Sequence, residues 1–224
     1  MKVSHRFVII AAIFITCLIV SNIIAVKPLR FGGIPAAIII FPISYIFGDI
    51  LTEVYGYRLA RRVIWLGFFC NLIAVVAIWL GQLLPPAAQW SGQSAYENIL
   101  GFAPRVLIAS FIAYLVGEFA NSYVLARMKI VTKGRWLWMR TIGSTVVGQG
   151  LDAAVFIPLV LIGRFDLSFI VVAIVTHWLV KVGYETLATP FTYAIVGYLK
   201  KAESIDTYDY GINFTPFSLD TDQT

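Results

Sequence analysis

The residues of this sequence that could do chemistry are polar side chains inside otherwise apolar segments. Asp49 and Glu53 lie four residues apart in FPISYIFGDILTEVYG, and the next basic residue is Arg58. Glu118 and Asn121 lie three residues apart in GEFANSYVLAR. Residues three or four apart share one face of a helix. Each segment is therefore predicted to form a helix with one polar stripe.

Two later segments repeat this pattern and add amide and basic groups. Gln149 and Asp152 are three residues apart in GSTVVGQGLDAAVF, and His177, Lys181 and Glu185 follow one another at spacings of four. Carboxylates accept hydrogen bonds or bind cations, whereas amides and ammonium groups donate to acceptors. Together these groups suit the recognition of a small polar ligand, or a proton relay within a membrane.

Signatures of intramembrane enzymes do not match these residues. Asp152 follows GQGL, so the GxGD spacing of an aspartyl protease is off by one residue. The HExxH zinc motif does not occur, since His5 and His177 are the only histidines. We therefore expect neither an enzyme nor a metal site or other cofactor.

The composition indicates that most of the chain lies in lipid. Of its 224 residues, 59% are hydrophobic and only 13% are charged, and the mean hydropathy is +0.84. Soluble domains average about 45–50% apolar and about 25% charged residues. A net charge of +5 would suit nucleic acid in a soluble protein, but here the basic residues lie mostly in short loops between apolar runs. We expect a lipid bilayer around the chain and no nucleic acid as a partner.

Six apolar segments are long enough to cross a membrane, which takes about 20 residues. The sequence therefore predicts an all-α polytopic membrane protein, with one six-helix transmembrane domain over residues 1–201 and an acidic cytoplasmic tail over residues 202–224. Pro190 is expected to break or kink the last helix. The predicted spans are residues 7–26, 34–57, 63–84, 104–127, 141–163 and 167–199.

The basic residues predict which side of the membrane each loop faces. With a cytoplasmic N-terminus, twelve lysines and arginines lie at the inner ends of the spans and four at the outer ends. Cytoplasmic loops carry an excess of Lys and Arg, so both termini are predicted to face the cytosol, in the plasma (inner) membrane. The inner set is Lys2, Arg6, Arg58, Arg61, Arg62, Arg127, Lys129, Lys133, Arg135, Arg140, Lys200 and Lys201; the outer set is Lys27, Arg30, Arg105 and Arg164.

The polar stripes are predicted to meet in one interior cavity. At about 1.5 Å per residue, Asp49, Glu118 and Lys181 lie about 21–22 Å from the outer ends of their spans, and Asp152 about 16 Å. Five acids then face one lysine, so four of them are expected to have no cation of the protein to neutralise them. Either desolvation keeps some protonated, or the cavity takes a cation or a donor-rich ligand. A structural cluster, with Lys181 bonded to one or two carboxylates, is the alternative.

Long segments around these residues resemble a known family. They are SNIIAVK at residues 21–27, FPISYIFGDILTEVYG, GEFANSYVLARMK, GSTVVGQGLDAAVFIP, KVGYETLATPFTYAIVGYLKK and, in the tail, YDYGINFTPF. The sequence thereby resembles the queuosine precursor transporter family, also called the vitamin uptake transporter family, over nearly its whole length. The resemblance implies uptake of 7-cyano-7-deazaguanine and 7-aminomethyl-7-deazaguanine, bases that are salvaged for the queuosine nucleoside of tRNA. It also implies a six-helix fold similar to the S-components of energy-coupling-factor vitamin transporters.

A 7-deazaguanine base would suit the groups of the predicted cavity. One carboxylate can accept the parallel N1–H and amine donors of the guanine edge, a pairing worth about 1–3 kcal/mol of discrimination. Glu53 or Glu118 is predicted to fill this role. The O6 acceptor needs a donor, for which Gln149, Asn121 and Lys181 are available.

The remaining polar residues have less defined roles. The aminomethyl substituent is a cation and would suit a second carboxylate, either Asp49 or Asp152. Tyr45 offers an aromatic face for the flat ring, and Asn22, near the outer end of the first span, is either a gate residue or a helix cap. The predicted substrate-binding set is Asn22, Tyr45, Asp49, Glu53, Glu118, Asn121, Gln149, Asp152, Lys181 and Glu185.

Several alternatives stay open from the sequence. The chain could carry another small vitamin or nucleobase, coupled to protons through its acids. Small residues such as Gly143, Gly148 and Gly150 could pack helices within one protomer or between the protomers of a homo-oligomer. The loop at residues 85–104 is either a lid or a plain surface loop, and the tail is expected to pack on the cytoplasmic face.

Overall fold

The computed structural model describes residues 4–217 apart from residues 28, 31–35, 102–103 and 164–165. In this part of the chain six helical segments are long and apolar enough to cross a membrane, and there is no strand, which confirms the predicted all-α fold. Lys2, Arg164 and the tail after residue 217 lie outside the described residues. The helices are α1 (His5–Ile24), η1 (Ala36–Ile39), α2 (Phe41–Ile50), η2 (Leu51–Tyr55), α3 (Tyr57–Leu83), α4 (Gln93–Leu100), α5 (Pro104–Val131), α6 (Leu137–Leu161) and α7 (Leu167–Glu203).

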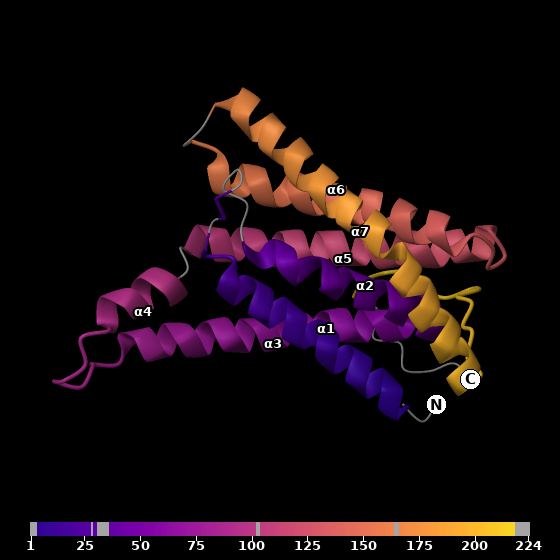
Figure 1. Cartoon of the computed structure of the whole chain (residues 1–224), viewed down its shortest axis with the longest axis horizontal. Coiled ribbons are helices and arrows are strands. Elements are labelled where there is room, and N and C mark those ends of the chain that lie inside the picture. Colours follow the sequence, from indigo (N-terminus) through magenta and orange to yellow (C-terminus); the bar gives the residue numbers. More distant parts are fainter. Residues whose placement is uncertain (1–3, 28, 31–35, 102–103, 164–165, 218–224) are drawn as a thin grey trace.

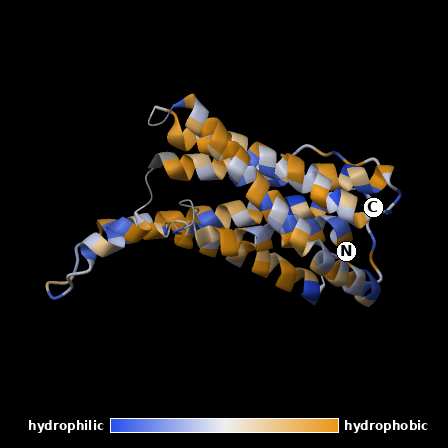
Figure 2. Cartoon of the chain, turned by 45° about the horizontal axis from the view of Figure 1, so that its top comes forward, coloured by the Kyte–Doolittle hydropathy of each residue, from blue (hydrophilic) through white to orange (hydrophobic). Residues whose placement is uncertain are grey.

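Both ends of the described chain lie at the same end of the helix bundle (Figure 1). The Ser4 hydroxyl donates to Glu203 Oε1 at 2.6 Å, and Arg6 Nη1 donates to the carbonyl of Ala202 at 3.1 Å. We call this the termini end, and the opposite end, where α4 lies, the far end. Apolar residues run along the long helices between these two ends (Figure 2).

The second membrane segment is built from three kinds of helix in series. The 3₁₀ turn η1, the α-helix α2 and the π-helical turn η2 together cover Ala36–Tyr55. Pro42 lies in the first turn of α2, where its missing N–H would have no intrahelical acceptor in any case. The π turn carries Glu53 and ends at Gly56, whose φ of 86° suits glycine. Single π turns within helices are frequent at functional sites.

Helices α5 and α6 approach each other through glycines. A Cβ added at Gly148 would lie 2.6 Å from Asn121 Cβ and 2.9 Å from the carbonyl oxygen of Gly117. Added Cβ atoms at Gly143 and Gly150 would meet Met128 and Trp178 of the same chain. These small residues therefore pack helices within the protomer, as such residues do in many membrane bundles.

Helix α7 runs without a break through Pro190, from Leu167 to Glu203. Of the two outcomes expected at Pro190, a break is therefore wrong, while a kink stays a prediction. Proline removes one backbone donor, but membrane helices tolerate it because neighbouring groups compensate for the freed carbonyl. As a result, α7 carries His177, Lys181 and Glu185 on one uninterrupted element.

The described part of the C-terminal tail packs along one face of α3. Tyr57, Arg61 and Trp65, spaced four residues apart, each donate to a tail carbonyl. The hydroxyl of Tyr57 reaches Phe214 O at 2.9 Å, and the indole N–H of Trp65 reaches Pro216 O at 2.9 Å. The tail is thus fastened at the termini end. In the loop at the far end, the structure adds the short helix α4, which the sequence analysis did not predict.

Candidate functional site

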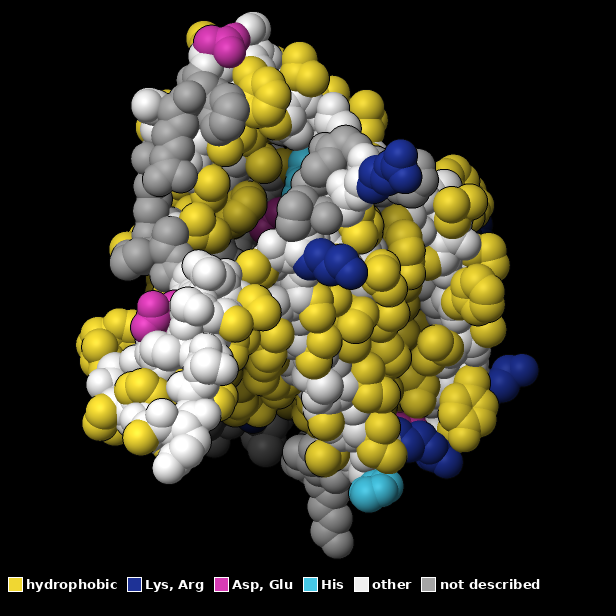
Figure 3. All heavy atoms as spheres, turned by 60° about the vertical axis from the view of Figure 1, so that its left-hand side comes forward, with side chains coloured by type: hydrophobic (Ala, Val, Ile, Leu, Met, Phe, Trp, Pro, Cys, Tyr) yellow, Lys and Arg dark blue, Asp and Glu magenta, His cyan; other side chains and the backbone are white. Residues whose placement is uncertain are grey.

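A cavity of about 110 Å³ opens at the far end of the bundle. Figure 3 shows a hollow on this side, with acidic and histidine atoms visible at its bottom. Its lining comes from α1, α2, α3, α5, α6 and α7 and the segment before α2. Asp152, His177 and Lys181 belong to that lining, so three of the residues singled out by helical spacing reach one space.

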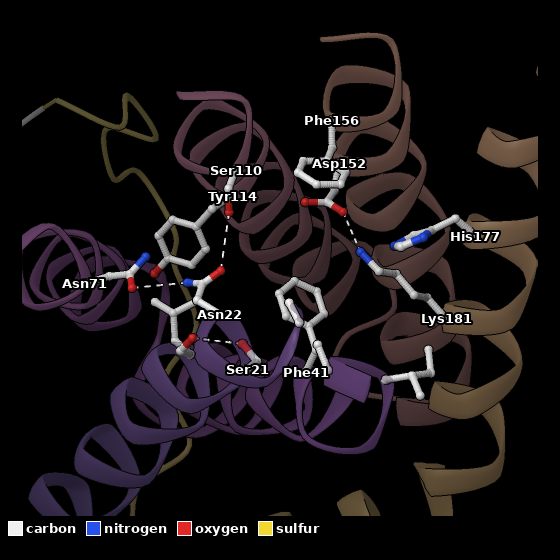
Figure 4. A pocket seen from close by; sticks show the side chains of 14 residues that line it. Ser21, Asn22, Phe41, Asn71, Ser110, Tyr114, Asp152, Phe156, His177 and Lys181 are labelled. Atoms are coloured by element: carbon white, nitrogen blue, oxygen red, sulfur yellow. Dashed lines mark hydrogen bonds and ion pairs between the residues drawn. The ribbon is translucent and has the colours of Figure 1, made fainter. Parts of the chain in front are cut away.

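Three polar side chains from α1, α3 and α5 join at one wall of this cavity (Figure 4). Asn22 donates from Nδ2 to Asn71 Oδ1 at 3.1 Å, and the Ser110 hydroxyl donates to Asn22 Oδ1 at 3.5 Å. Asn22 lies inside α1, whose C-cap is Ala25, so the helix-cap interpretation of Asn22 is wrong. Asn71 could not be predicted from the sequence, because it is a single amide in α3 with no polar residue at helical spacing to mark it.

Lys181 and Asp152 form an ion pair at the cavity (Figure 4). The lysine Nζ lies 2.5 Å from Asp152 Oδ2 and 4.4 Å from the ring centroid of Phe41. Both charged side chains are buried. The one lysine expected within a span is therefore already matched by a carboxylate and an aromatic face.

Further acids lie next along the same helices, towards the termini end. Glu118 on α5 is 0% exposed and Glu185 on α7 is 1% exposed, and no described residue hydrogen-bonds to either carboxyl group. Asp49 on α2 accepts one hydrogen bond, from Asn121 Nδ2 to its Oδ1 at 2.6 Å, while its Oδ2 has no partner among the described residues. A buried charge without a partner is strongly unfavourable. This set of acids is therefore suited to a proton or to an incoming donor.

Neutral polar groups around these acids also lack partners in the described part of the chain. They are Tyr45 Oη, Asn121 Oδ1, Thr145 Oγ1 and Gln149 Oε1, and all four side chains are buried. The hydroxyl of Tyr45 lies near the carboxyl groups of Glu118 and Asp152 and the amide of Gln149. Thr145 was not predicted, although its spacing of four from Gln149 is the signal that could have found it. We call these four groups, together with Asp49, Glu118 and Glu185, the central cluster.

Glu53 is not part of this cluster, because basic residues surround it. Arg140 forms a two-point contact, with Nη2–Oε1 at 2.7 Å and Nε–Oε2 at 3.2 Å, and Lys200 Nζ lies 2.7 Å from Oε1. Lys129 Nζ lies 3.6 Å from Oε1 and donates to the backbone carbonyl of Glu53 at 2.5 Å. The expectation that four of the five acids have no protein cation is wrong, since Asp152 and Glu53 are both paired. The cations of Glu53 lie just beyond the predicted span ends, and long basic side chains can reach inwards from there.

The C-terminal tail completes this ion cluster at the termini end. Asp206 Oδ1 lies 2.5 Å from Lys129 Nζ and 2.9 Å from Lys200 Nζ. Partial burial raises the pKa of Asp206, but the hydrogen bonds from the two lysines outweigh it and hold the pKa below its usual value. Asp209 nearby has its pKa raised by burial, although it accepts a hydrogen bond from the Tyr57 N–H at 2.9 Å. We call Glu53, Lys129, Arg140, Lys200 and Asp206 the ion cluster.

Comparison with known proteins decides the family. The family model described as "Putative vitamin uptake transporter" matches residues 35–195. The chain belongs to this family. It is therefore a multi-pass membrane transporter of a small molecule and not an enzyme, as the sequence analysis predicted. Within the described residues, no group of three His, Cys, Asp or Glu side chains could hold a metal ion.

Curated relatives agree with this assignment. The chain is 30% identical over 178 residues to the "Probable queuosine precursor transporter" of Bacillus subtilis (strain 168), covering 78% of this chain and 77% of the relative. It is 28% identical over 116 residues to the "Queuosine precursor transporter" of Escherichia coli (strain K12), covering 52% of this chain and 50% of that protein. No solved structure matches the fold significantly. The likeness to S-components therefore stays a prediction.

Proposed function

We propose that this transporter takes up queuosine precursors and binds them in the central cluster between α2, α5, α6 and α7. The ligands are 7-cyano-7-deazaguanine and 7-aminomethyl-7-deazaguanine. The observation that carries the proposal is the carboxyl group of Glu118, which is fully buried and has no hydrogen-bond partner for either oxygen among the described residues. A ligand with two parallel donors would satisfy both oxygens at once.

Each group of the base then has a counterpart in the chain. Glu118 accepts from N1–H and the exocyclic amine, which leaves the O6 acceptor for the amide of Gln149 or Asn121. Of the two acids predicted to read the guanine edge, we retain Glu118, since the ion cluster occupies both carboxyl oxygens of Glu53. Tyr45, beside Glu118 and Gln149, supplies a ring and a hydroxyl at the same place.

The two ends of the bundle differ in a way that suits uptake. We assign the far end, with its cavity, to the outside and the termini end to the cytosol, because the basic residues predict that orientation. The cavity brings the base past Asn22 and Asn71 to the Asp152–Lys181 pair. The ion cluster and the attached tail close the cytoplasmic side of the same path. The membrane is the plasma membrane in this proposal.

Binding to the purified protein tests the proposal. The two deazaguanines are titrated beside guanine, adenine and a panel of vitamins, by calorimetry or thermal shift. We expect saturable binding of the deazaguanines and a loss of about 10- to 100-fold in affinity for Glu118→Gln, from the loss of a charge-assisted pairing. Glu97→Gln, on the exposed side of α4, is the matched control. Binding of another base or vitamin in their place would assign a different substrate, and wild-type affinity in Glu118→Gln would remove this residue from the site.

A further inference from the structure

Two acids of the central cluster form a pair across helices α2 and α7. Asp49 is 0% exposed and Glu185 is 1% exposed, their helices α2 and α7 pack against each other, and the two carboxyl groups lie within electrostatic range of one another. Asn121 donates to one oxygen of Asp49 at 2.6 Å. The other three oxygens of the pair have no hydrogen-bond partner among the described residues.

The charges around this pair do not neutralise it. Glu118 on α5 and Glu53 on the π turn also act on Asp49, and both are acids. Lys181, one turn before Glu185 on α7, is held by Asp152 at 2.5 Å. The cations of the ion cluster contact Glu53 and Asp206 instead. No ion pair among the described residues therefore includes Asp49 or Glu185.

Two neighbouring buried carboxyl groups cannot both be ionised at low cost. Like charges at one site force at least one of them to hold a proton, and burial acts in the same direction. One positive charge from outside relieves this repulsion, and it can be either a proton or a cationic group of a ligand. A ligand ammonium would also supply several donors for the unpartnered oxygens.

We propose that the Asp49–Glu185 pair is the subsite for the positively charged arm of a cationic base, and that it exchanges a proton for that arm. When the aminomethyl base binds, one carboxylic O–H bond breaks, the proton passes to water, and the ammonium group donates to the carboxylate that forms. When the neutral cyano base binds, the proton stays on the pair. The net charge of the occupied site is then the same for both bases. This inference rests on the proposed function and adds how one site accepts a neutral and a cationic ligand.

Counting protons released on binding tests this exchange. The purified full-length protein is titrated with each base near pH 7 in phosphate and in Tris, whose ionisation enthalpies differ, so that the heat difference reports the protons released. Protons lost from Glu118 would be common to both bases and cancel. We expect 7-aminomethyl-7-deazaguanine to release about one proton more than 7-cyano-7-deazaguanine, because one ammonium replaces one proton.

Variants assign this extra proton to the pair. Glu185→Gln should abolish the difference in proton release and weaken binding of the aminomethyl base by about 10- to 100-fold. Binding of the cyano base should weaken less than binding of the aminomethyl base, because its neutral arm makes no ion pair with Asp49 and Glu185. Asp49→Asn is the second variant, used if Glu185→Gln does not fold, and Glu97→Gln is the exposed control that should change neither quantity.

The outcomes separate this inference from the proposed function. If neither base binds the wild-type protein, the proposed function fails, and the exchange fails with it. If both bases bind and release the same number of protons, the exchange is refuted while the proposed function stands. Persistence of the extra proton in both variants would also refute the assignment to Asp49 and Glu185.

Discussion

The contrast between Glu53 and Glu118 gives the sharpest prediction from this structure. Both are fully buried acids on neighbouring helices, and both are 0% exposed. Glu53 is bound by Arg140 and Lys200, whereas Glu118 has no hydrogen-bond partner among the described residues. Substituting each by glutamine removes a charge with almost no change of shape. The two substitutions should therefore have opposite consequences for stability and for binding.

Glu53→Gln should destabilise the folded protein, because the cations of the ion cluster then lose their central anion. Breaking a buried ion pair by removing one partner costs about 3–5 kcal/mol. In a chain of this size, about 2–4 °C of melting temperature accompanies each kcal/mol, so a fall of about 6–20 °C is expected. Glutamine retains one acceptor for Arg140, which places the result towards the lower part of that range. Glu118→Gln removes no ion pair and should shift the melting temperature by no more than about 4 °C.

Thermal unfolding of the ligand-free proteins, purified in one detergent and followed by intrinsic tryptophan fluorescence, measures both effects. Titration with the deazaguanines at a temperature where both variants are folded then measures binding. We expect a fall in melting temperature for Glu53→Gln and a loss of affinity for Glu118→Gln. A Glu53→Gln protein that melts with the wild type, together with a Glu118→Gln protein that melts well below it, would refute the division into a structural and a ligand-binding acid.

Three more predictions concern packing, the Asp152–Lys181 pair and the tail. Gly148→Ala should separate α5 from α6 and lower the yield of folded protein, whereas Gly183→Ala, with nothing within 4 Å of its added Cβ, should not; gel filtration compares them. Asp152→Asn leaves Lys181 buried without an anion and should cost about 3–5 kcal/mol, measured by thermal unfolding, and adding Lys181→Gln should recover much of it. The pKa of Asp206 is lowered in the folded protein, so its contribution to tail attachment is present above pH about 4 and is lost as the pH falls through the lowered value. Asp206→Asn should therefore speed hydrogen exchange of the tail amides at pH 7, with a difference from wild type that shrinks on acidification.

The sequence predicted the helices well because the signals for them are local. Apolar length identifies a span and a spacing of three or four identifies a polar face, whatever the helix packs against. Asp152 and Lys181 reach the far-end cavity, as the stripes on their helices suggested. The depth of a residue along its helix, however, does not determine which polar faces of neighbouring helices contact each other. The helical rise predicts similar depths for Asp49 and Lys181, yet Lys181 pairs with Asp152 and Asp49 with the amide of Asn121.

The partners of Glu53 could not be predicted, since they come from outside the apolar segments. Lys129, Arg140 and Lys200 belong to three different helices, each just past the end of a predicted span. In the sequence they belong to the basic set from which the cytoplasmic side is predicted. Nothing in the sequence indicates that they also neutralise Glu53. Asn71 was missed for a different reason. A single amide in an apolar helix has no periodic neighbour, and only the fold brings it to Asn22.

The acids that lack a partner are informative about ligand binding, because the protein leaves the cost of burying them uncompensated. An acid within a membrane costs about 2.5–3.5 kcal/mol on insertion scales, and a salt bridge can offset that cost, as the cations around Glu53 do. Glu118, Glu185 and the second oxygen of Asp49 receive no such compensation from the described residues. Apolar residues of similar volume would make the ligand-free protein at least as stable. Under the proposed function, a ligand completes the hydrogen bonds of these three acids, which accounts for the stability that they forgo.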